Sequence, residues 1–385
     1  MKVQTYGAGA ALLAAAAISQ AAPPSFTSVE IPLPAGATHF AAGVGINSQG
    51  DIAGVFGPEC CGGTPFVYFH ASGSDVVFSG SNATGLNDSD QVAGAVIDQN
   101  SQPQAALWSN SGVVQALPAD DISMAAAVSN DGDVVGAVAN GGGSLAVLWN
   151  SQPTVQLTSL GVLWTNPVLP EADSSAAQAV NNASHVTGWS DAGQGTTPDT
   201  AQPFGTHAFL FRNGTLLDLG ALALTSNGSD FSEGNGINNL DAVVGDSQTA
   251  IPAVNSRGQA CADCGVASHA FLWQAGTIQD LGTLGGVAGL DSRADAINDS
   301  GEIVGWSDTL VKGKSTQLAF LYSGGQMLNL RSLVTGLDPN VRLTEAVGIN
   351  CQGWIVANGF NIKTPTVSQI YLLIRNGAPR QQCTP

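Results

Sequence analysis

A ten-residue motif that recurs seven times constrains the fold of this chain more than any other feature. Its first copy runs from Gly45 to Gly54 and reads Gly-Ile-Asn-Ser-Gln-Gly-Asp-Ile-Ala-Gly. The third position recurs at intervals of 40 to 60 residues as Asn47, Asn87, Ser129, Asn181, Asn238, Asn298 and Asn350. Because the motif keeps its length while the intervals vary, we expect it to form one defined turn, with insertions between the copies.

Each repeat unit has the pattern of four β-strands. A run of small residues ends at the motif, whose Asn, Asp, Ser and Gly residues suit a tight turn, and a Val-Val-Gly type of strand follows. A third, apolar-aromatic strand comes next, as at His207 to Phe211, and a fourth follows a short turn, as at Leu216 to Leu219. Four antiparallel strands in a unit of this length form a blade of a β-propeller.

The two ends of the chain predict how the ring closes. The seventh unit has no clear fourth strand after Asn376-Gly377, whereas Phe26 to Leu33 precedes the first unit. If this segment completes the last blade, no open sheet edge remains. We therefore predict an all-β fold: residues 22–385 form one β-propeller of seven four-stranded blades. Six blades is the alternative if one divergent copy is not a blade.

The first 21 residues have the features of a signal peptide. Lys2 precedes the apolar run Ala10 to Ile18, and Ser19-Gln20-Ala21 fits cleavage after Ala21. The run is shorter than the roughly 20 residues that span a bilayer, and no later segment reaches that length. We expect a secreted, extracellular protein without a membrane span in the mature chain; a periplasmic location and an uncleaved N-terminal anchor are the alternatives.

The charge balance excludes one class of partner. The chain has 11 Lys and Arg against 29 Asp and Glu, a net charge of -18. Such a chain repels phosphate backbones, so we expect no nucleic-acid partner. With 44% hydrophobic residues it can bury a core, which argues against general disorder.

Six cysteines are compatible with disulfides in an exported chain. Cys261-Ala-Asp-Cys264 fits a local clip, a redox pair or half of a metal site, and we favour the clip because no second Cys-x-x-Cys is present. Cys351 and Cys383 are candidates to fasten the C-terminal tail to the last repeat. A bond between the adjacent Cys60 and Cys61 would be strained, and the sequence leaves the connectivity open.

Two units share a His-Ala-Phe segment followed by Asp-Leu-Gly. They are His207-Ala208-Phe209-Leu210-Phe211 with Asp218-Leu219-Gly220, and His269-Ala270-Phe271-Leu272-Trp273 with Asp280-Leu281-Gly282. With these segments the chain resembles the HAF-repeat extracellular proteins of bacteria. The resemblance extends over nearly all of the mature chain, although other units have lost the His or the Phe, as at Leu145-Ala146-Val147. It implies secretion and a repeat fold, and it brings no catalytic residues to transfer.

Long connections predict where a ligand binds. In a ring of antiparallel blades, the second-to-third and fourth-to-next-first connections lie on one face, which we call the long-loop face. It receives the insertions at 57–64, 160–175, 190–206, 221–235 and 247–268. Long loops on a rigid scaffold commonly carry binding residues. Tryptophan beside carboxylates suits a sugar, so the candidate ligand-binding residues are Trp164, Glu171, Asp173, Asp230, Glu233 and Arg257.

Other recurrent residues receive structural interpretations. We expect Trp189 and Trp306 to pack between blades, and His207 and His269 to cap turns. The acidic turns Asn130 to Asp133 and Asn298 to Glu302 share oxygen ligands with calcium loops but do not match the twelve-residue pattern. We predict no metal site and no cofactor, with calcium as the open alternative.

The first functional interpretation is a non-enzymatic binding module that recognises a carbohydrate, envelope or matrix component through the long-loop face. A propeller enzyme acting on polysaccharide, using Glu171, Asp173, Asp230 or Glu233, is the second. A purely structural matrix protein is the third. The chain has no Gly-x-Ser-x-Gly, His-Glu-x-x-His or phosphate-binding Gly-Lys-Ser/Thr string, which disfavours several enzyme classes and leaves catalysis undecided.

Overall fold

A computed structural model describes residues 23–377 and 383, except 36, 38–39, 58–62, 152–153, 166–171, 194–204, 225–229, 262 and 366. The predicted signal peptide, Cys60, Cys61 and Glu171 lie outside the described residues. Among those described, no helix is long and apolar enough to cross a membrane.

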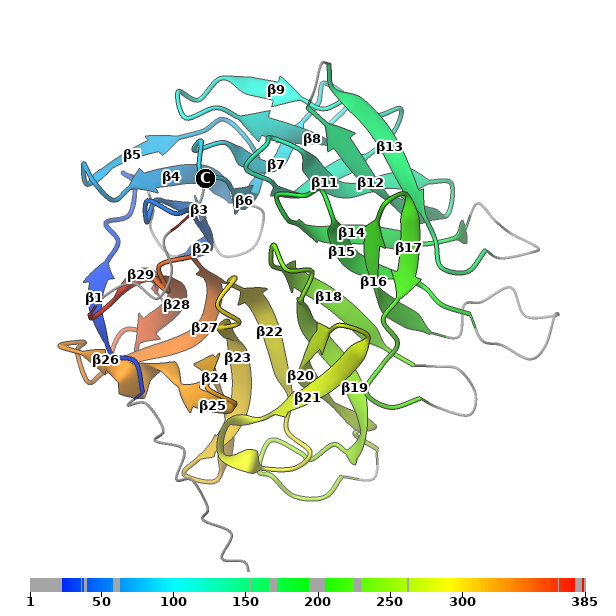
Figure 1. Cartoon of the computed structure of the whole chain (residues 1–385). Coiled ribbons are helices and arrows are strands. Elements are labelled where there is room, and N and C mark those ends of the chain that lie inside the picture. Colours follow the sequence, from blue (N-terminus) through cyan, green and yellow to red (C-terminus); the bar gives the residue numbers. More distant parts are fainter. Residues whose placement is uncertain are drawn as a thin grey trace, which may run out of the picture.

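Seven antiparallel sheets surround a common axis, and the colours in Figure 1 follow the chain once around the ring. The innermost strands are β2 (Phe40–Ile46), β6 (Asn82–Leu86), β10 (Ser123–Val128), β14 (Ser175–Val180), β18 (Ser232–Ile237), β22 (Ser292–Ile297) and β27 (Val341–Ile349). The second strands are β3 (Ile52–Gly57), β7 (Val92–Ile97), β11 (Val134–Asn140), β15 (Val186–Asp191), β19 (Val243–Pro252), β23 (Ile303–Val311) and β28 (Ile355–Asn361).

The outer half of each blade holds the third and fourth strands. The third strands are β4 (Thr64–Phe69), β8 (Pro103–Trp108), β12 (Gly143–Asn150), β16 (Thr206–Arg212), β20 (Val266–Gln274), β24 (Lys314–Ser323) and β29 (Ser368–Arg375). The fourth strands are β5 (Ser74–Val77), β9 (Val114–Ala116), β13 (Gln156–Gly161), β17 (Thr215–Asp218), β21 (Thr277–Gly282), β25 (Gln326–Asn329) and β1 (Phe26–Glu30). Short 3-10 helices η2 (Leu284–Gly286) and η3 (Leu330–Leu333) follow β21 and β25.

The N-terminal strand completes the last blade, as the sequence predicts. β1 pairs antiparallel with β29, from Phe26 opposite Arg375 to Glu30 opposite Tyr371, and the two-residue strand β26 (Val334–Thr335) pairs parallel to its other side. In Figure 1 the blue β1 lies beside the red β29. The propeller therefore has seven blades, and its first and last strands in sequence share one sheet.

Apolar side chains fill the spaces between blades. One core cluster packs Leu107 and Leu117 of the second blade against Val147 and Trp149 of the third. At the closure, Phe66 of the first blade meets residues of the last blade. Removing apolar surface from water contributes roughly 25 cal/mol per Å². This burial between neighbouring sheets holds the ring together.

Each innermost strand carries a bulge at the same place. The strand pairings skip one residue there in every blade, and these seven bulge residues are Val44, Thr84, Ala126, Gln178, Asn235, Asp295 and Val347; β27 has a second shift, at Thr344. The final Gly of the motif lies against this bulge: a Cβ at Gly136 would stand 2.0 Å from the carbonyl oxygen of Met124, and one at Gly305 would stand 2.0 Å from that of Arg293. The repeated Gly is thus explained by close backbone contact.

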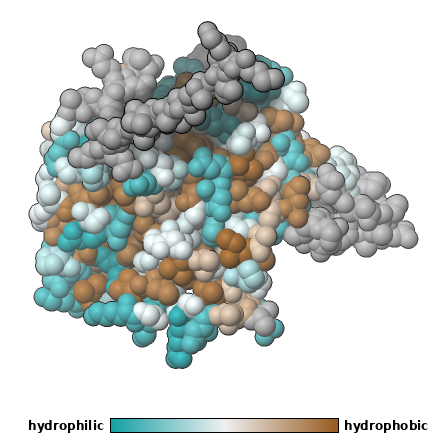
Figure 2. Space-filling view, turned by 60° about the horizontal axis from the view of Figure 1, so that its bottom comes forward, coloured by the Kyte–Doolittle hydropathy of each residue, from teal (hydrophilic) through white to brown (hydrophobic). Residues whose placement is uncertain are grey.

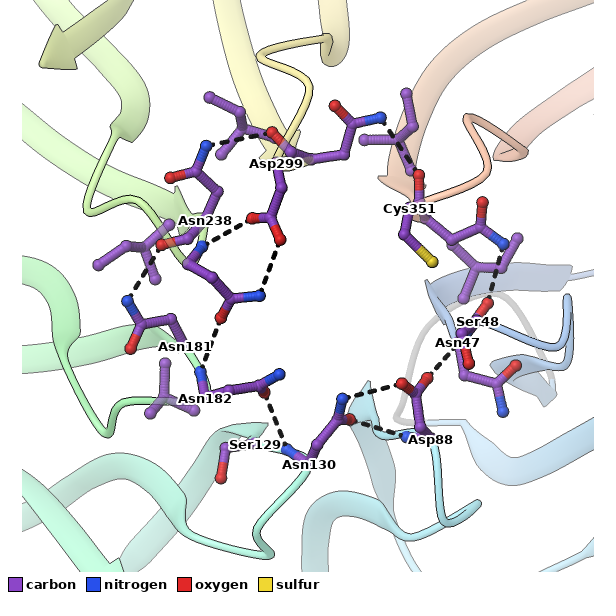
Figure 3. Close-up of a pocket in the computed structure, with 18 of the residues that line it drawn as sticks. Asn47, Ser48, Asp88, Ser129, Asn130, Asn181, Asn182, Asn238, Asp299 and Cys351 are labelled. Atoms are coloured by element: carbon purple, nitrogen blue, oxygen red, sulfur yellow. Dashed lines mark hydrogen bonds between the residues drawn. The ribbon is translucent and has the colours of Figure 1, made fainter. Parts of the chain in front are cut away.

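The repeated Asn folds its own turn and bonds to the next blade. Asn47 Oδ1 accepts hydrogen bonds from the backbone N–H groups of Gln49 and Asp51. Its Nδ2 donates to the carbonyl oxygen of Asn87 in the next turn, and the same bond occurs at six of the seven junctions, with lengths of 2.9 to 3.5 Å. Figure 3 shows this Asn ring, which surrounds a polar cavity of about 250 Å³.

The predicted disulfides form within the described residues. Cys261 bonds to Cys264 as a local clip, and Cys351 bonds to Cys383, which fastens the tail to the seventh turn. The connection predicted at 247–268 is shorter than expected, because β19 and β20 continue to pair as far as Pro252 and Val266.

Candidate functional site

The bulges of the innermost strands line a central cavity. Its volume is about 640 Å³, and its lining includes all seven bulge residues. Each innermost strand begins at the long-loop face and ends at the Asn turn, and the cavity is lined mainly by the earlier residues of these strands. The central cavity therefore lies toward the long-loop face, and the polar cavity of the Asn ring lies at the opposite end of the axis.

The wall of the central cavity is chemically asymmetric. The first four blades contribute small, apolar or neutral polar residues, among them Ala42, Val44, Thr84, Ala126 and Gln178. The last two blades contribute charged residues, Arg293, Asp295 and Glu345. Glu233 of the fifth blade occupies the strand position equivalent to Arg293, since each lies opposite the residue that follows the motif Gly. One side of the wall can pack against apolar surface, and the other can bond polar groups.

Arg293 lies at the centre of a group of five charged residues. Its Nε lies 2.9 Å from Asp295 Oδ1, and the two side chains are 43% and 10% exposed. Across the sheet, Arg293 faces Trp306 and Glu233 faces Asp246. We call Glu233, Asp246, Asp295 and Glu345, together with Arg293, the charged sector.

Neutral side chains hold this sector in place. Asn235 Nδ2 donates to Asp246 Oδ1 at 3.3 Å and to the carbonyl oxygen of Ala294 at 3.2 Å, which links the fifth and sixth blades. Ser268 Oγ donates to Asp246 Oδ2 at 3.1 Å. Asn358, opposite Glu345, exchanges two hydrogen bonds with the backbone of Gly43 in the first blade. The sector is therefore built across blade boundaries.

Burial raises the pKa of each carboxyl group in the sector. For Asp246, Asp295 and Glu345, the loss of water raises the pKa and the charge of Arg293 opposes that rise; the pKa of Asp295 lies well above its ordinary value. For Glu233, burial and the charge of Asp246 both raise the pKa. Burial alone would lower the pKa of Arg293, but the carboxylates around it raise that pKa. The four carboxyl groups should therefore exchange protons closer to neutral pH than exposed carboxyls do.

One acceptor in the sector has no hydrogen bond. Asp295 Oδ2 is buried and makes none among the described residues, and the Nε of Arg293 also lacks one despite its proximity to Oδ1. A buried oxygen without a partner costs free energy. Asp295 lines the cavity, but Oδ2 itself has almost no accessible surface, so a donor in the cavity can reach it once the carboxylate turns.

Of the six candidate residues predicted from sequence, Glu233 joins the charged sector. Trp164 is half-buried beside Gly193, and its backbone N–H donates to the carbonyl oxygen of Asp191. Asp173 and Asp230 are buried at blade junctions, and Arg257 is exposed in a turn. Trp164, Asp173, Asp230 and Arg257 all lie outside the lining of the central cavity, and Glu171 lies outside the described residues.

The histidines of the HAF segments join strands within and between blades. His207 Nδ1 lies 2.8 Å from Asp218 Oδ1, and His269 Nδ1 lies 2.9 Å from Asp280 Oδ1. The same Asp218 oxygen accepts from the N–H of Gly220, whose carbonyl accepts from Ser232 Oγ of the next blade. Each His thus fixes the fourth strand. The described part of the chain contains no group of three or more His, Cys, Asp or Glu suited to a metal ion.

Arg293, Asp295 and Glu345 were not among the sequence candidates, although the sequence holds a signal for them. Like the candidate Glu233, both Arg293 and Glu345 stand five positions before a motif Asn, and Asp295 stands three before. The corresponding positions in the first four units are uncharged: Ala42, Asn82, Met124 and Ala176. Aligning the small-residue runs that precede the motifs would have shown charge confined to the last three blades.

The outer surface is a weaker candidate for a binding site than the central cavity. Figure 2 shows hydrophobic and hydrophilic residues interspersed over the face in view. The exposed large hydrophobic residues of the described chain are scattered, and several lie on or beside the outer strands, such as Val77, Val114 and Leu217. Scattered apolar residues are ordinary on protein surfaces.

Comparison with known proteins supports the fold. No protein-family model matches the sequence, and no curated protein matches it. The acylaminoacyl peptidase of Pyrococcus horikoshii superposes with a TM-score of 0.51 at 9% identity, over 88% of this chain and 53% of that chain. This chain thus spans about half the length of the peptidase, and the likeness establishes a shared architecture.

Two other solved structures align less closely. The polysaccharide lyase Uly1 aligns with a TM-score of 0.48 at 8% identity, over 85% of this chain and 88% of that one. A mutant of the Aleuria aurantia lectin, in complex with alpha-methyl-L-fucoside, aligns with a TM-score of 0.35 at 10% identity, over 79% and 95%. At these values, neither comparison bears on the function of this chain.

Proposed function

We propose that this chain is a secreted binding protein that takes part of a saccharide, from an envelope or matrix component, into its central cavity from the long-loop face. The asymmetric wall of the cavity is the observation that carries this proposal. Sugar rings combine apolar faces with many hydroxyl groups. The alanine and valine side of the cavity can pack against the apolar faces, and the charged sector can form hydrogen bonds with the hydroxyl groups.

The size of the cavity and its free acceptor support the same conclusion. A volume of about 640 Å³ falls within the range of small-molecule sites, roughly 300 to 1,000 Å³. Asp295 Oδ2 has no hydrogen-bond donor among the described residues, and a sugar hydroxyl would supply one. The net charge of -18 disfavours strongly anionic polysaccharides.

A cavity-filling substitution tests the site. Ala126→Trp would occupy the apolar side of the cavity without changing any charge, and Val113→Trp would add the same bulk at an exposed position that is 69% accessible. On a glycan array, the wild-type protein and the Val113 variant should bind the same glycans, and the Ala126 variant should lose them. Equal binding by a folded Ala126 variant would contradict the proposal.

Catalysis on polysaccharide is the second candidate, favoured by the raised pKa of four neighbouring carboxyl groups. A protonated carboxylic acid beside an ionised one is the equipment of glycoside hydrolysis. Release of reducing ends from a polysaccharide, lost in Glu233→Gln or Glu345→Gln, would favour this function. Binding without turnover would favour the first, and self-assembly with neither would favour a structural role.

A further inference from the structure

The charged sector has more negative than positive groups. Four carboxyl groups, from Glu233, Asp246, Asp295 and Glu345, act on the single guanidinium of Arg293. Arg293 is the one cationic residue among the described residues that line the central cavity. Carboxylates withdrawn from water without enough positive charge are costly, so a ligand that brings a cation would relieve this sector more than a neutral ligand would.

A cationic group of a ligand would bind next to Asp295. Its side chain is only 10% exposed, it lines the cavity, and Oδ2 has no hydrogen bond among the described residues. The neighbouring Arg293 already lies against Oδ1. The Asp295 carboxylate therefore has unused capacity to accept a hydrogen bond, which a charged donor in the cavity could use once the carboxylate turns Oδ2 toward it. Hydrogen bonds between ionised partners are about twice as strong as neutral ones.

We propose that the cavity recognises the protonated amine of an amino sugar, with the ammonium group bonded to the carboxylate of Asp295 and compensated by Glu345 and the Glu233–Asp246 pair. This inference rests on the proposed saccharide-binding function and specifies its ligand. The apolar side of the cavity, near Val44 and Ala126, would then pack against the face of the sugar ring.

An organic ammonium suits the sector better than a metal ion does. Calcium takes six to eight oxygen ligands around one point, whereas Arg293 lies among these carboxylates and would repel a divalent cation. No group suited to a metal ion occurs in the described residues. An ammonium group needs only a few acceptors on one side, which Asp295 and its neighbours supply.

Matched oligosaccharides test the amine directly. Calorimetric titration would compare a glucosamine oligomer with the N-acetylglucosamine oligomer of equal length, because acetylation removes the charge and keeps the ring. We expect the amino form to bind at least about tenfold more tightly at pH 6, the effect of losing one charged hydrogen bond. Its affinity should also increase with rising pH as the carboxyl groups of the sector ionise, and because burial raises their pKa this increase should come at higher pH than for exposed carboxyls.

Charge-neutralising variants identify the acceptor. Asp295→Asn should weaken binding of the amino form by about tenfold or more and barely change the acetylated form, and Glu345→Gln should act in the same direction. Asp75→Asn is the control, since it removes the same charge from an exposed outer strand. Equal losses in the Asp75 and Asp295 variants would mean that overall charge alone attracts the amine.

The outcomes separate this inference from the proposed function. If both oligomers bind equally and Ala126→Trp abolishes both, the saccharide site stands and the amine preference is wrong. If neither these oligomers nor any glycan on the array binds, both proposals fall. Preferential binding of the amino form, lost selectively in the folded Asp295 variant, supports both.

Discussion

Asn350 donates a hydrogen bond from its Nδ2 to the backbone carbonyl oxygen of Asn47, 3.0 Å away, and so joins the last blade to the first. Its Oδ1 accepts from the N–H groups of Gln352 and Trp354 within its own turn. One buried side chain therefore satisfies its local turn and the ring closure together.

Loss of this side chain should weaken the ring. Asn350→Ala leaves two backbone donors and one carbonyl oxygen without their partner at a position that is 5% exposed. We expect the free energy of unfolding to fall by roughly 2 to 4 kcal/mol. Urea denaturation would measure the change, with Asn100→Ala, in an exposed turn, as the control. Equal stability of the two variants would contradict a closing role for Asn350.

The ring has one natural gap that can be filled. Ser129 is too short to reach the next carbonyl oxygen. This junction keeps only the second type of bond, from the N–H of Asn130 to Asn182 Oδ1 at 3.3 Å, which other junctions make in addition to the Asn bond, as from Ser48 to Asp88. Because Ser129 borders the polar cavity, there is room for a longer side chain. Ser129→Asn should supply the seventh bond and raise stability by about 0.5 to 1.5 kcal/mol. An unchanged or lower melting temperature would show that the gap is enforced by its surroundings.

Asp90 should make the fold sensitive to pH. Burial, and next the charge of Asp51, raise its pKa to about 6. A carboxyl group whose pKa is raised on folding stabilises the protein while protonated, and this stability is lost as the pH rises from about 4 through about 6. Asp90→Asn stays neutral, and Asn tolerates the positive φ of 56° at this position.

The Asp90 variant should therefore gain stability over the wild type at high pH only. We expect a gain of about 1 kcal/mol at pH 7.5, allowing for solvent screening, and near-equality at pH 4. Thermal melting across this range measures it. A difference that does not vary with pH would show that Asp90 does not titrate in this window.

The two disulfides should differ in their contribution to stability. Cys351–Cys383 closes a separation of 32 residues, and Cys261–Cys264 closes one of 3. In the chain-entropy model, the longer loop restricts the unfolded state more, by roughly 2 kcal/mol. Replacing both cysteines of each pair by Ser, and measuring urea unfolding of each double variant, tests this. A larger loss at Cys261–Cys264 would contradict it.

The N-terminal strand should be essential for closure. Deletion of residues 23–31 would expose the paired edge of β29 and remove Phe26 and Ile31, which are 0% and 2% exposed. An unpaired strand edge invites aggregation, so we expect loss of cooperative melting and a shift to large species in size-exclusion chromatography. A synthetic peptide of residues 23–33 should restore the melt, and a scrambled peptide should not. A cooperative melt without the peptide would refute the closure role.

Much of the fold follows from local chemistry repeated along the chain. The motif Asn folds each turn through its own backbone neighbours, and strand patterning follows from small and apolar residues, so seven blades and the exchange of β1 into the last blade were predictable. The pairings Cys261–Cys264 and Cys351–Cys383 were among the sequence candidates, but fifteen connectivities were open until the strands brought these sulfurs together.

The charged sector was decided by the ring itself. Glu233 was among the sequence candidates, whereas Arg293 and Glu345, in two other repeats, each resemble a solvated charge on a small-residue strand when taken alone. Closing seven blades around one axis turns equivalent strand positions toward a shared cavity, where water is scarce and charges interact. The spacing of residues in the sequence determines the turn that each motif forms. The distances between residues of different blades, and therefore the pKa shifts and contacts in the cavity, are set only when the blades pack around the axis.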